Sequence, residues 1–449
     1  MADKLLLIAC HFPPGGGIQV QRALSLAKYL PQNGFEVHVL TTRYPQVPYY
    51  DPGLLRHIPE SVKVHRTWSL EPPFHIRKRI WSLFGSARGS SGKASQKPAA
   101  QPGVKQYLRG VVTRRLTPDP QRLWYPFAMH CADRLIERES IRYVLVTAPP
   151  FSTFLIGNEL KKRHPGISLV SEFRDEWLDY FLNTFGFRDE TVRRRAAEIE
   201  RDTVERSDTI VAVTPTALRA IRRRYVDQPK AKFRLIPNGY DPEAFAGFLP
   251  RRHNAGRIVI TFTGTVYQPS SPAAFLDALD RLPDEVRMRF ETRFVGRIAD
   301  EMDPAIFQSR RSEVKLLGFV HQEQAFRYME ETDYLLLPWN DHLNVPGKLY
   351  EYLATNKPVI ALVPPGSDSH RLLEDSGLAR IIDPEDDVAL ARTLMKIGLN
   401  GDAPVVQSNG AAITKFERPR LTAQYGALIR QTPSAEIQAD PFGALVEEN

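Results

Sequence analysis

The sequence predicts an α/β protein built from two doubly wound domains, each with a mainly parallel sheet. Its 449 residues exceed what one ordinary hydrophobic core supports. Short apolar runs also alternate with helical patterns, and this alternation occurs twice. The expected strands are 4–10, 35–42, 143–148, 167–173 and 209–214 in the first series, and 257–264, 288–296, 314–320, 333–339 and 358–363 in the second. We place the domains at 1–246 and 257–412.

The individual segments support this division. The run KLLLIAC is expected to be a buried strand, residues 20–34 an amphipathic helix, and FEVHVLTT the next strand. The stretch FLPRRHNAGR near residue 250 has the composition of a linker. The second series therefore begins a new domain.

The composition indicates a globular protein of a reducing compartment. Hydrophobic residues make up 42% of the chain and charged residues 25%, which is ordinary for a water-soluble fold. The two cysteines, Cys10 and Cys131, are too few for a disulfide framework. No apolar run approaches the length of a membrane-spanning helix, and no signal peptide is apparent. We therefore expect a cytoplasmic location.

Charge is distributed unevenly between the two halves. Residues 1–250 carry 38 Lys or Arg against 24 Asp or Glu, whereas residues 251–449 carry 22 against 28. A basic half indicates an anionic partner, which could be nucleic acid, an anionic bilayer or a phosphorylated substrate. The nucleic-acid reading lacks interleaved aromatic residues and a known binding module, so we expect no nucleic-acid partner.

The first candidate site is the glycine-rich loop HFPPGGGIQVQR at 11–22, which follows the first strand. Consecutive glycines allow the backbone to approach a phosphate or a sugar closely at a helix start. A nicotinamide-cofactor fingerprint is disfavoured, because Val20 occupies the third glycine position and the second strand ends in Thr41 and Thr42 without an acid. An ordinary tight turn stays open as the alternative.

The second candidate is VSEFRDEW at 170–177, where a strand ends. Glu172 and Asp175 could orient a substrate hydroxyl or stabilise positive charge on a sugar, and Arg174 lies between them. We predict Asp175 and Glu172 as catalytic residues that contact an acceptor hydroxyl, with His11 as a weaker candidate. The alternative is a solvated loop that holds an Arg–carboxylate pair.

The third candidate is NVPGKLYEYLATNKPVIALV at 344–363. Pro346 suits the first turn of a helix, and the amides there favour an anion, to which Lys348 adds a full charge. Glu351 lies one turn later on the same side, and Asn356 followed by Pro358 ends the helix. The alternative is an ordinary surface pair of Lys348 and Glu351.

Taken together, these motifs resemble the GT-B glycosyltransferases, specifically glycosyltransferase family 4. The resemblance spans nearly the whole chain and depends on the order of its motifs: the glycine-rich loop, VTAPPFSTFLIGNELKKR (146–163) with EFRDEW, RLIPNGYDPEAF (234–245), FTGTVYQPS (262–270) and PGKLYEYLATNKP (346–358). It implies two Rossmann-like domains that face each other across a cleft. It also implies a C-terminal helix, 416–431, that returns to the N-terminal domain.

The resemblance implies roles for particular residues. The C-terminal domain would bind a nucleoside-diphosphate sugar, with Glu351 on the ribose and Lys348 and the amides around Gly347 on the diphosphate. Gly16 and Gly17 would lie near the donor phosphates and sugar. We also assign Arg174, Gly264, Thr265 and Asn344 to substrate binding.

Two departures from the family pattern affect the donor site. The family often carries two glutamates separated by seven residues, and the first would fall at Leu343. Many members also have an Arg and a Lys after the strand that ends in Thr-Gly, whereas Thr265 and Gln268-Pro269-Ser270 follow Gly264 here. Lys348 must then carry more of the phosphate neutralisation.

The expected reaction is transfer of a glycosyl group from a nucleotide sugar. Negative charge that develops on the leaving diphosphate would be stabilised by Lys348 and helix amides. No Asp-x-Asp pair ends a strand, so we expect no metal and no other cofactor, with Lys348 as a catalytic residue. The resemblance implies retention of anomeric configuration. A GT-B scaffold that has lost turnover and binds glycans or membranes is the competing interpretation.

A basic insertion at 75–116 suggests where the acceptor is found. It contains ten Lys or Arg and no acidic residue, and aromatic and aliphatic residues flank its Gly- and Ser-rich middle. Such flanks suit segments that lie on an anionic bilayer. The acceptor would then be a lipid-linked saccharide or a cell-surface polysaccharide precursor at the cytoplasmic leaflet. The alternative is an insertion whose apolar flanks pack on the domain and not on a bilayer.

Overall fold

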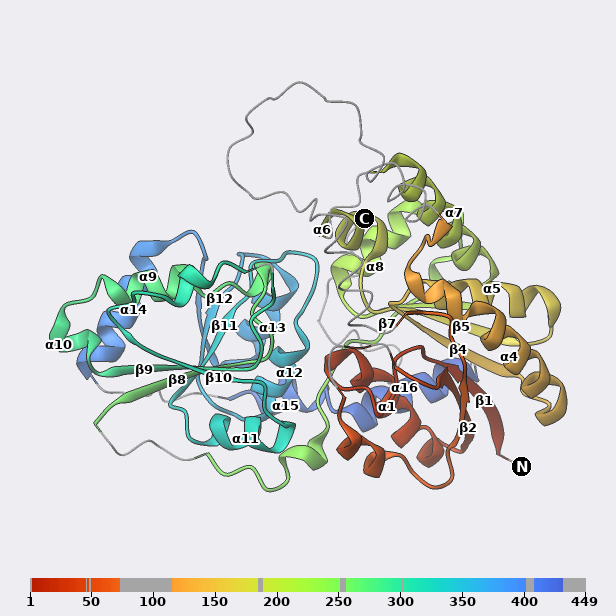
Figure 1. Cartoon of the computed structure of the whole chain (residues 1–449), viewed down its shortest axis with the longest axis horizontal. Helices are drawn as coiled ribbons and strands as arrows, with labels where there is room; N and C mark the ends of the chain where they lie inside the picture. The colour runs from red at the N-terminus through yellow and green to blue at the C-terminus, as the bar shows by residue number, and fades with distance from the viewer. Residues whose placement is uncertain are drawn as a thin grey trace. The chain divides into compact units, whose positions relative to one another are not determined.

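The structure is a computed structural model that describes residues 2–45, 47, 50–72, 115–184, 189–250, 256–300, 302–400 and 408–430. The chain forms two compact units. Unit 1 contains the described residues up to Ile236 and those from Thr422 onwards, and unit 2 contains Pro237–Leu421. Each unit contains a sheet covered by helices, and we describe each unit by itself (Figure 1).

Unit 1 contains a seven-stranded parallel sheet in the order β3-β2-β1-β4-β5-β6-β7. Its strands are β1 (Asp3–Ile8), β2 (Phe35–Thr42), β3 (Lys63–Thr67), β4 (Tyr143–Ala148), β5 (Ser168–Phe173), β6 (Thr209–Ala212) and β7 (Phe233–Leu235). Its helices are α1 (Ile18–Tyr29), α4 (Tyr125–Glu139), α5 (Ser152–Arg163), α6 (Leu182–Thr184), α7 (Glu190–Arg206) and α8 (Pro215–Arg224).

The core of unit 1 lies between the sheet and the helices that cover it. Leu5 to Ile8 of β1 are fully buried, as expected for an inner parallel strand with helices over both of its faces. Helices α4, α5 and α7 lie side by side against the sheet (Figure 1). The expected helix at 20–34 is observed as α1, which continues into a 3₁₀ turn at Pro31–Asn33 and ends at Gly34 with φ 81°.

Unit 2 contains a six-stranded parallel sheet in the order β10-β9-β8-β11-β12-β13. Its strands are β8 (Ile258–Thr263), β9 (Phe290–Val295), β10 (Glu313–Gly318), β11 (Tyr334–Pro338), β12 (Val359–Leu362) and β13 (Ala379–Ile382). Its helices are α9 (Ala273–Asp280), α10 (Asp284–Arg287), α11 (Gln322–Glu330), α12 (Gly347–Ala354), α13 (Asp368–Ser376), α14 (Asp387–Asn400), α15 (Gly410–Thr414) and the start of α16 (Arg418–Ile429).

The predicted fold class is confirmed, and all ten predicted strands are present. In both sheets the strand order reverses beside the first strand, between β1 and β4 in unit 1 and between β8 and β11 in unit 2. Ligands of doubly wound sheets bind beyond the carboxyl ends of the strands at such a reversal. The glycine-rich loop after β1 and the loops after β8 and β11 occupy these positions.

Helix α16 joins the two units through the covalent chain. Its first residues, up to Leu421, belong to unit 2, and those from Thr422 belong to unit 1. In unit 1, Arg430 follows the helix and donates from Nε to Asp3 Oδ2 at 2.7 Å and from Nη1 to the Asn33 carbonyl at 3.0 Å. The boundary between the units lies at Ile236 and Pro237 rather than near residue 250, because residues from Gly239 pair with Phe416 and its neighbours.

Among the described residues, no helix is both long and apolar enough to cross a bilayer. Residues 75–114 of the predicted basic insertion lie outside the described residues. The prediction made on that segment therefore stays a prediction.

Candidate functional site

The loop between β11 and α12 holds the start of helix α12 in place. Asp341 Oδ1 accepts hydrogen bonds from the Leu343 amide at 2.7 Å and the Asn344 amide at 3.2 Å. Trp339 Nε1 donates to the Asn344 carbonyl at 2.8 Å. Pro346 is the residue before the first helical position, and no described side chain caps the helix there. The first amides of α12 therefore keep the capacity to bind an anion.

Lys348 extends from the first turn of α12 toward strand β8. Its Nζ lies 3.7 Å from the centre of the Phe262 ring, so the ring face partly balances its charge. Within the described part of the chain, this buried Nζ has no hydrogen-bond partner. Burial lowers the pKa of Lys348 to about 7, and only the charge of Glu351 opposes that change. An anion placed beside Nζ would restore the charged form.

The backbone around Gly264 leaves room for the Lys348 side chain. Gly264 has φ +107°, and a Cβ atom there would lie 3.3 Å from Lys348 Nζ. The next loop is also close: Gly296 has φ +141°, and a Cβ atom on it would lie 2.1 Å from the Gly264 carbonyl oxygen. A side chain at either position is disfavoured by the backbone, and at 296 it would displace the loop that borders Lys348.

Glu351 and Asn344 supply polar groups on either side of Lys348 in the sequence. Burial raises the pKa of Glu351, while Arg418 and Lys348 act in the opposite direction. Asn344 is 7% exposed, and both polar atoms of its side chain lack a partner among the described residues. A buried side-chain amide without hydrogen-bond partners destabilises the fold unless a ligand or a water molecule supplies those hydrogen bonds. Thr265, also predicted to bind substrate, is half-buried after Gly264.

Tyr352 ties α12 to β8, and sequence reasoning did not identify it. Its hydroxyl oxygen accepts a hydrogen bond from the Thr263 amide at 2.9 Å. Burial raises the pKa of Tyr352 to about 12. At the other end of the helix, the predicted stop is confirmed, since Asn356 has φ 56° directly before Lys357 and Pro358.

In unit 1, the glycine-rich loop leads directly into α1 as expected. Gly16 is buried, and Gly17 is exposed with φ 87° at the residue that precedes the helix. No described side chain caps α1. His11, the weaker candidate, is half-buried at the start of this loop.

Glu172 forms a buried ion pair within unit 1. It is fully buried, and its Oε1 accepts from Arg22 Nε at 2.7 Å and from the Tyr425 hydroxyl. Thr147 Oγ1 donates to Oε2 at 2.6 Å. Burial opposes ionisation, but Arg22 and these hydrogen bonds outweigh it and hold the pKa of Glu172 below its ordinary value. These contacts give Glu172 a structural role, and its predicted contact with an acceptor has no support in this geometry.

Arg174 connects the first turn of α1 to the loop after β4 by donating to a carbonyl group in each. Its Nη1 donates to the Gln19 carbonyl at 2.7 Å, and its Nη2 donates to the Pro149 carbonyl. Asp175 is half-buried just beyond the end of β5. The structure thus places Arg174 beside the start of α1 and separates the buried Glu172 from Asp175. The contact of Asp175 with a substrate stays a prediction.

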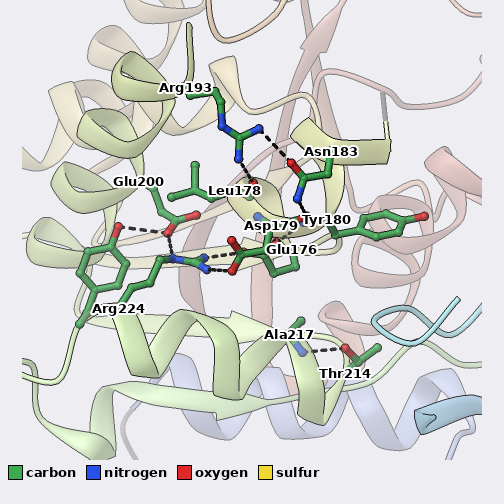
Figure 2. A network of polar contacts seen from close by, with 11 residues as sticks. Glu176, Leu178, Asp179, Tyr180, Asn183, Arg193, Glu200, Thr214, Ala217 and Arg224 are labelled. Atoms are coloured by element: carbon green, nitrogen blue, oxygen red, sulfur yellow. Dashed lines mark hydrogen bonds and ion pairs between the residues drawn. The ribbon is translucent and has the colours of Figure 1, made fainter. Parts of the chain in front are cut away.

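The turn that follows Asp175 is held by a polar network that the sequence did not reveal (Figure 2). Arg224 of α8 donates to Glu176 Oε1 at 2.5 Å, to Asp179 Oδ2 at 2.7 Å and to Glu200 Oε1 at 2.9 Å. Glu176 Oε2 also accepts from the Asp179 and Tyr180 amides. Burial raises the pKa of Glu200 to about 7, although Arg224 acts in the opposite direction. The network fixes the π-helical turn Trp177–Phe181 against α7 and α8.

Comparison with known families gives matches over both units. Residues 16–239 match the family described as Glycosyl transferase 4-like domain, and residues 257–398 match the family described as Glycosyl transferases group 1. No curated protein sequence matches the chain.

Several solved structures share the fold. Sucrose-phosphate synthase from Thermosynechococcus elongatus is 15% identical with a TM-score of 0.63, over 96% of this chain and 98% of that one. HepE of Anabaena, solved with UDP-glucose, is 12% identical with a TM-score of 0.60, over 95% and 99%. WaaG, a glycosyltransferase of lipopolysaccharide biosynthesis, is 14% identical with a TM-score of 0.59, over 95% and 99%. At these identities the likeness shows the fold alone.

Proposed function

We propose a reaction from one established premise: the chain belongs to the family 4 glycosyltransferases of GT-B fold. It transfers a glycosyl group from a nucleoside-diphosphate sugar to a lipid-linked saccharide or a cell-surface polysaccharide precursor. Unit 2 binds the donor at the start of α12. The observation that carries this assignment is the buried Lys348 Nζ, which has no hydrogen-bond partner among the described residues.

The donor diphosphate occupies the space beside Lys348 and the first amides of α12. A diphosphate satisfies both the helix amides and the ammonium group, which are otherwise costly to bury. Glu351, one turn later, accepts hydrogen bonds from the ribose hydroxyls. Asn344 has a side chain that both donates and accepts, and it binds hydroxyls of the transferred sugar.

The same groups favour bond cleavage. As the glycosidic bond to the diphosphate breaks, negative charge grows on the leaving phosphate oxygens while the sugar gains oxocarbenium character. Lys348 and the fixed amides stabilise that charge more strongly in the transition state than in the ground state. In unit 1, Asp175 contacts the acceptor hydroxyl. Transfer retains the anomeric configuration and needs no metal.

The nucleotide is a uridine nucleotide in this proposal. Supporting it, HepE of Anabaena has been solved with UDP and with UDP-glucose. The acceptor assignment follows from the basic N-terminal half and the insertion at 75–116, whose ten cationic residues match an anionic membrane.

A second candidate function is a glycan- or membrane-binding protein with weakened turnover. Leu343 favours it, because an apolar side chain occupies the position where the family often has a glutamate. Lys348 and Glu351 disfavour it, because a buried ammonium group is costly to a protein that binds no anionic donor beside it.

A donor screen tests the proposal. Thermal unfolding of the purified chain is measured with UDP-, GDP-, ADP- and dTDP-sugars, because a ligand that binds only the folded state raises Tm by mass action. We expect one nucleotide class to raise Tm in the wild type and to lose most of that effect in Lys348→Ala. Release of free nucleoside diphosphate from the same donors then separates the two candidates. An enzyme hydrolyses its donor slowly even without acceptor, and a binding protein does not.

A further inference from the structure

A cluster of metal-binding side chains lies in unit 1, on elements that the transfer site does not use. Glu36 and His38 are two residues apart on β2 and therefore project from the same face of the strand. Glu139 is the last residue of α4, which packs against β2 and β3. His65 lies on the neighbouring strand β3. The four side chains meet beside the sheet, where α4 ends.

We propose that Glu36, His38 and Glu139 form a binding site for a divalent transition-metal ion of the zinc type. One ligand atom from each residue lies within 4.8 Å of the other two. His38 Nε2 and Glu36 Oε1 are 3.3 Å apart. With metal–ligand bonds of about 2.0–2.1 Å, two ligands of a tetrahedral ion are separated by about 3.3–3.4 Å. Glu36 and His38 already have the required spacing. A change of rotamer brings the Glu139 carboxylate to bonding distance from the same ion.

The donor types select the ion. One imidazole and two carboxylates suit Zn²⁺ and related ions, whereas Mg²⁺ and Ca²⁺ prefer oxygen ligands alone. His38 is fully buried, which distinguishes the cluster from exposed carboxylates gathered on a surface. Three protein ligands leave a fourth position for water.

His65 orients the histidine ligand. Its Nε2 lies 3.2 Å from His38 Nδ1, and the two rings are stacked with their centres 5.3 Å apart. When a metal occupies His38 Nε2, the proton of His38 must be on Nδ1, from which it is donated to His65. Histidine ligands are commonly held in this way by an acceptor on the other ring nitrogen.

Two lysines compete with the metal for the carboxylates. Lys63 Nζ lies 2.6 Å from Glu36 Oε1, and Lys4 Nζ lies 2.8 Å from Glu139 Oε2. The side chain of Lys63 is 50% exposed and can turn into solvent when a metal enters. Removal of Lys63 should therefore strengthen metal binding.

The position of the cluster separates it from glycosyl transfer. Glu36 and His38 lie in the first half of β2, whereas the loops of the candidate site follow the carboxyl ends of the strands. Bound metal links α4 to β2 and stabilises the folded state of unit 1 by mass action. This inference is independent of the proposed reaction, whose chemistry uses no metal.

The experiment is a calorimetric titration of Zn²⁺ into tag-free protein that has been stripped of metal and freed of chelator. Thermal unfolding and the visible absorption of added Co²⁺ are recorded on the same samples. Glu139→Gln removes one ligand at a partly exposed helix end. Glu137→Gln is the matched control, because Glu137 is an exposed carboxylate on the same helix. His65→Gln and Lys63→Gln test the orienting and competing groups.

We expect one Zn²⁺ per chain, a higher Tm with Zn²⁺, and no effect of Mg²⁺. Glu139→Gln and His65→Gln should each weaken Zn²⁺ binding by about tenfold or more, Glu137→Gln should leave it unchanged, and Lys63→Gln should tighten it. Absence of stoichiometric Zn²⁺ binding to the wild type overturns the proposal. So does equal affinity in Glu139→Gln and Glu137→Gln.

Discussion

Replacing Lys348 with methionine should stabilise the ligand-free protein while it abolishes tight donor binding. Methionine keeps most of the aliphatic volume of lysine but removes the ammonium group. That group is buried beside Phe262, without a hydrogen-bond partner in the described part of the chain. The wild-type protein therefore tolerates a charge that only a ligand makes favourable.

The size of the effect follows from the pKa of Lys348. Burial lowers it from an ordinary 10.5 to about 7. Each pKa unit corresponds to about 1.4 kcal/mol, so at pH 7 the lysine costs the folded state up to about 4 kcal/mol. Between pH 7 and 10.5 the unfolded chain binds more protons here than the folded chain does. The wild-type free energy of unfolding should thus rise with pH, and the advantage of Lys348→Met should shrink by about 2 kcal/mol from pH 7 to pH 9.

Urea unfolding of the two proteins at pH 7, 8 and 9 measures these differences, with Lys396→Met on the exposed side of α14 as the control. Nucleotide affinity is measured at the same pH values. In the wild type it should fall by up to about 50-fold between pH 7 and 9, because the free lysine must first gain a proton. In Lys348→Met it should be weak and independent of pH. A destabilised Lys348→Met protein that keeps wild-type affinity would refute the reasoning.

Three further substitutions test other parts of the account. Glu351→Gln should weaken nucleotide binding by about tenfold through the ribose contact without lowering Tm, because burial already disfavours the charged carboxylate; unchanged affinity in calorimetry would remove Glu351 from the site. Tyr425→Phe should lower the free energy of unfolding by about 1–3 kcal/mol in urea, because its hydroxyl bridges the buried Arg22 and Glu172, whereas the same change at the exposed Tyr44 should have no effect. Gly296→Ala should lower both Tm and nucleotide affinity, since the new Cβ would collide with the Gly264 carbonyl. Gly366→Ala is its control, with a positive φ of +69° and open space around the Cβ position, and equal losses in both variants would mean that the collision with Gly264 is not responsible.

Much of the fold was predictable because inner parallel strands are continuous apolar runs. The strands that were missed lack that signal. β3 has the sequence KVHRT, in which one residue is aliphatic, β7 has three residues, and β13 begins with Ala-Arg. All three are edge strands, where burial is incomplete and the apolar pattern weakens.

The start of α12 was predictable because its signals are local in sequence. Proline, glycine, lysine and glutamate follow one another within six residues of a helix start. The buried ion pair of Glu172 was not predictable, because its partners Arg22 and Tyr425 are 150 and 253 residues away in the chain. Separation in sequence also concealed the Arg224 network in Figure 2, whose partners are 24, 45 and 48 residues away, and the meeting of Glu139 with β2. The period-two spacing of Glu36 and His38 was the one local signal of that cluster.

The most direct test of the central claim is hydrogen exchange of the backbone amides with and without UDP at saturating concentration. In the proposed complex the diphosphate lies on the first amides of α12, close to Gly264. Peptides that cover 344–354 and 262–266 should therefore exchange more slowly when UDP is bound, and this protection should be lost in Lys348→Met. If UDP binds but the exchange rates of both peptides stay unchanged, the assignment of the donor site is wrong.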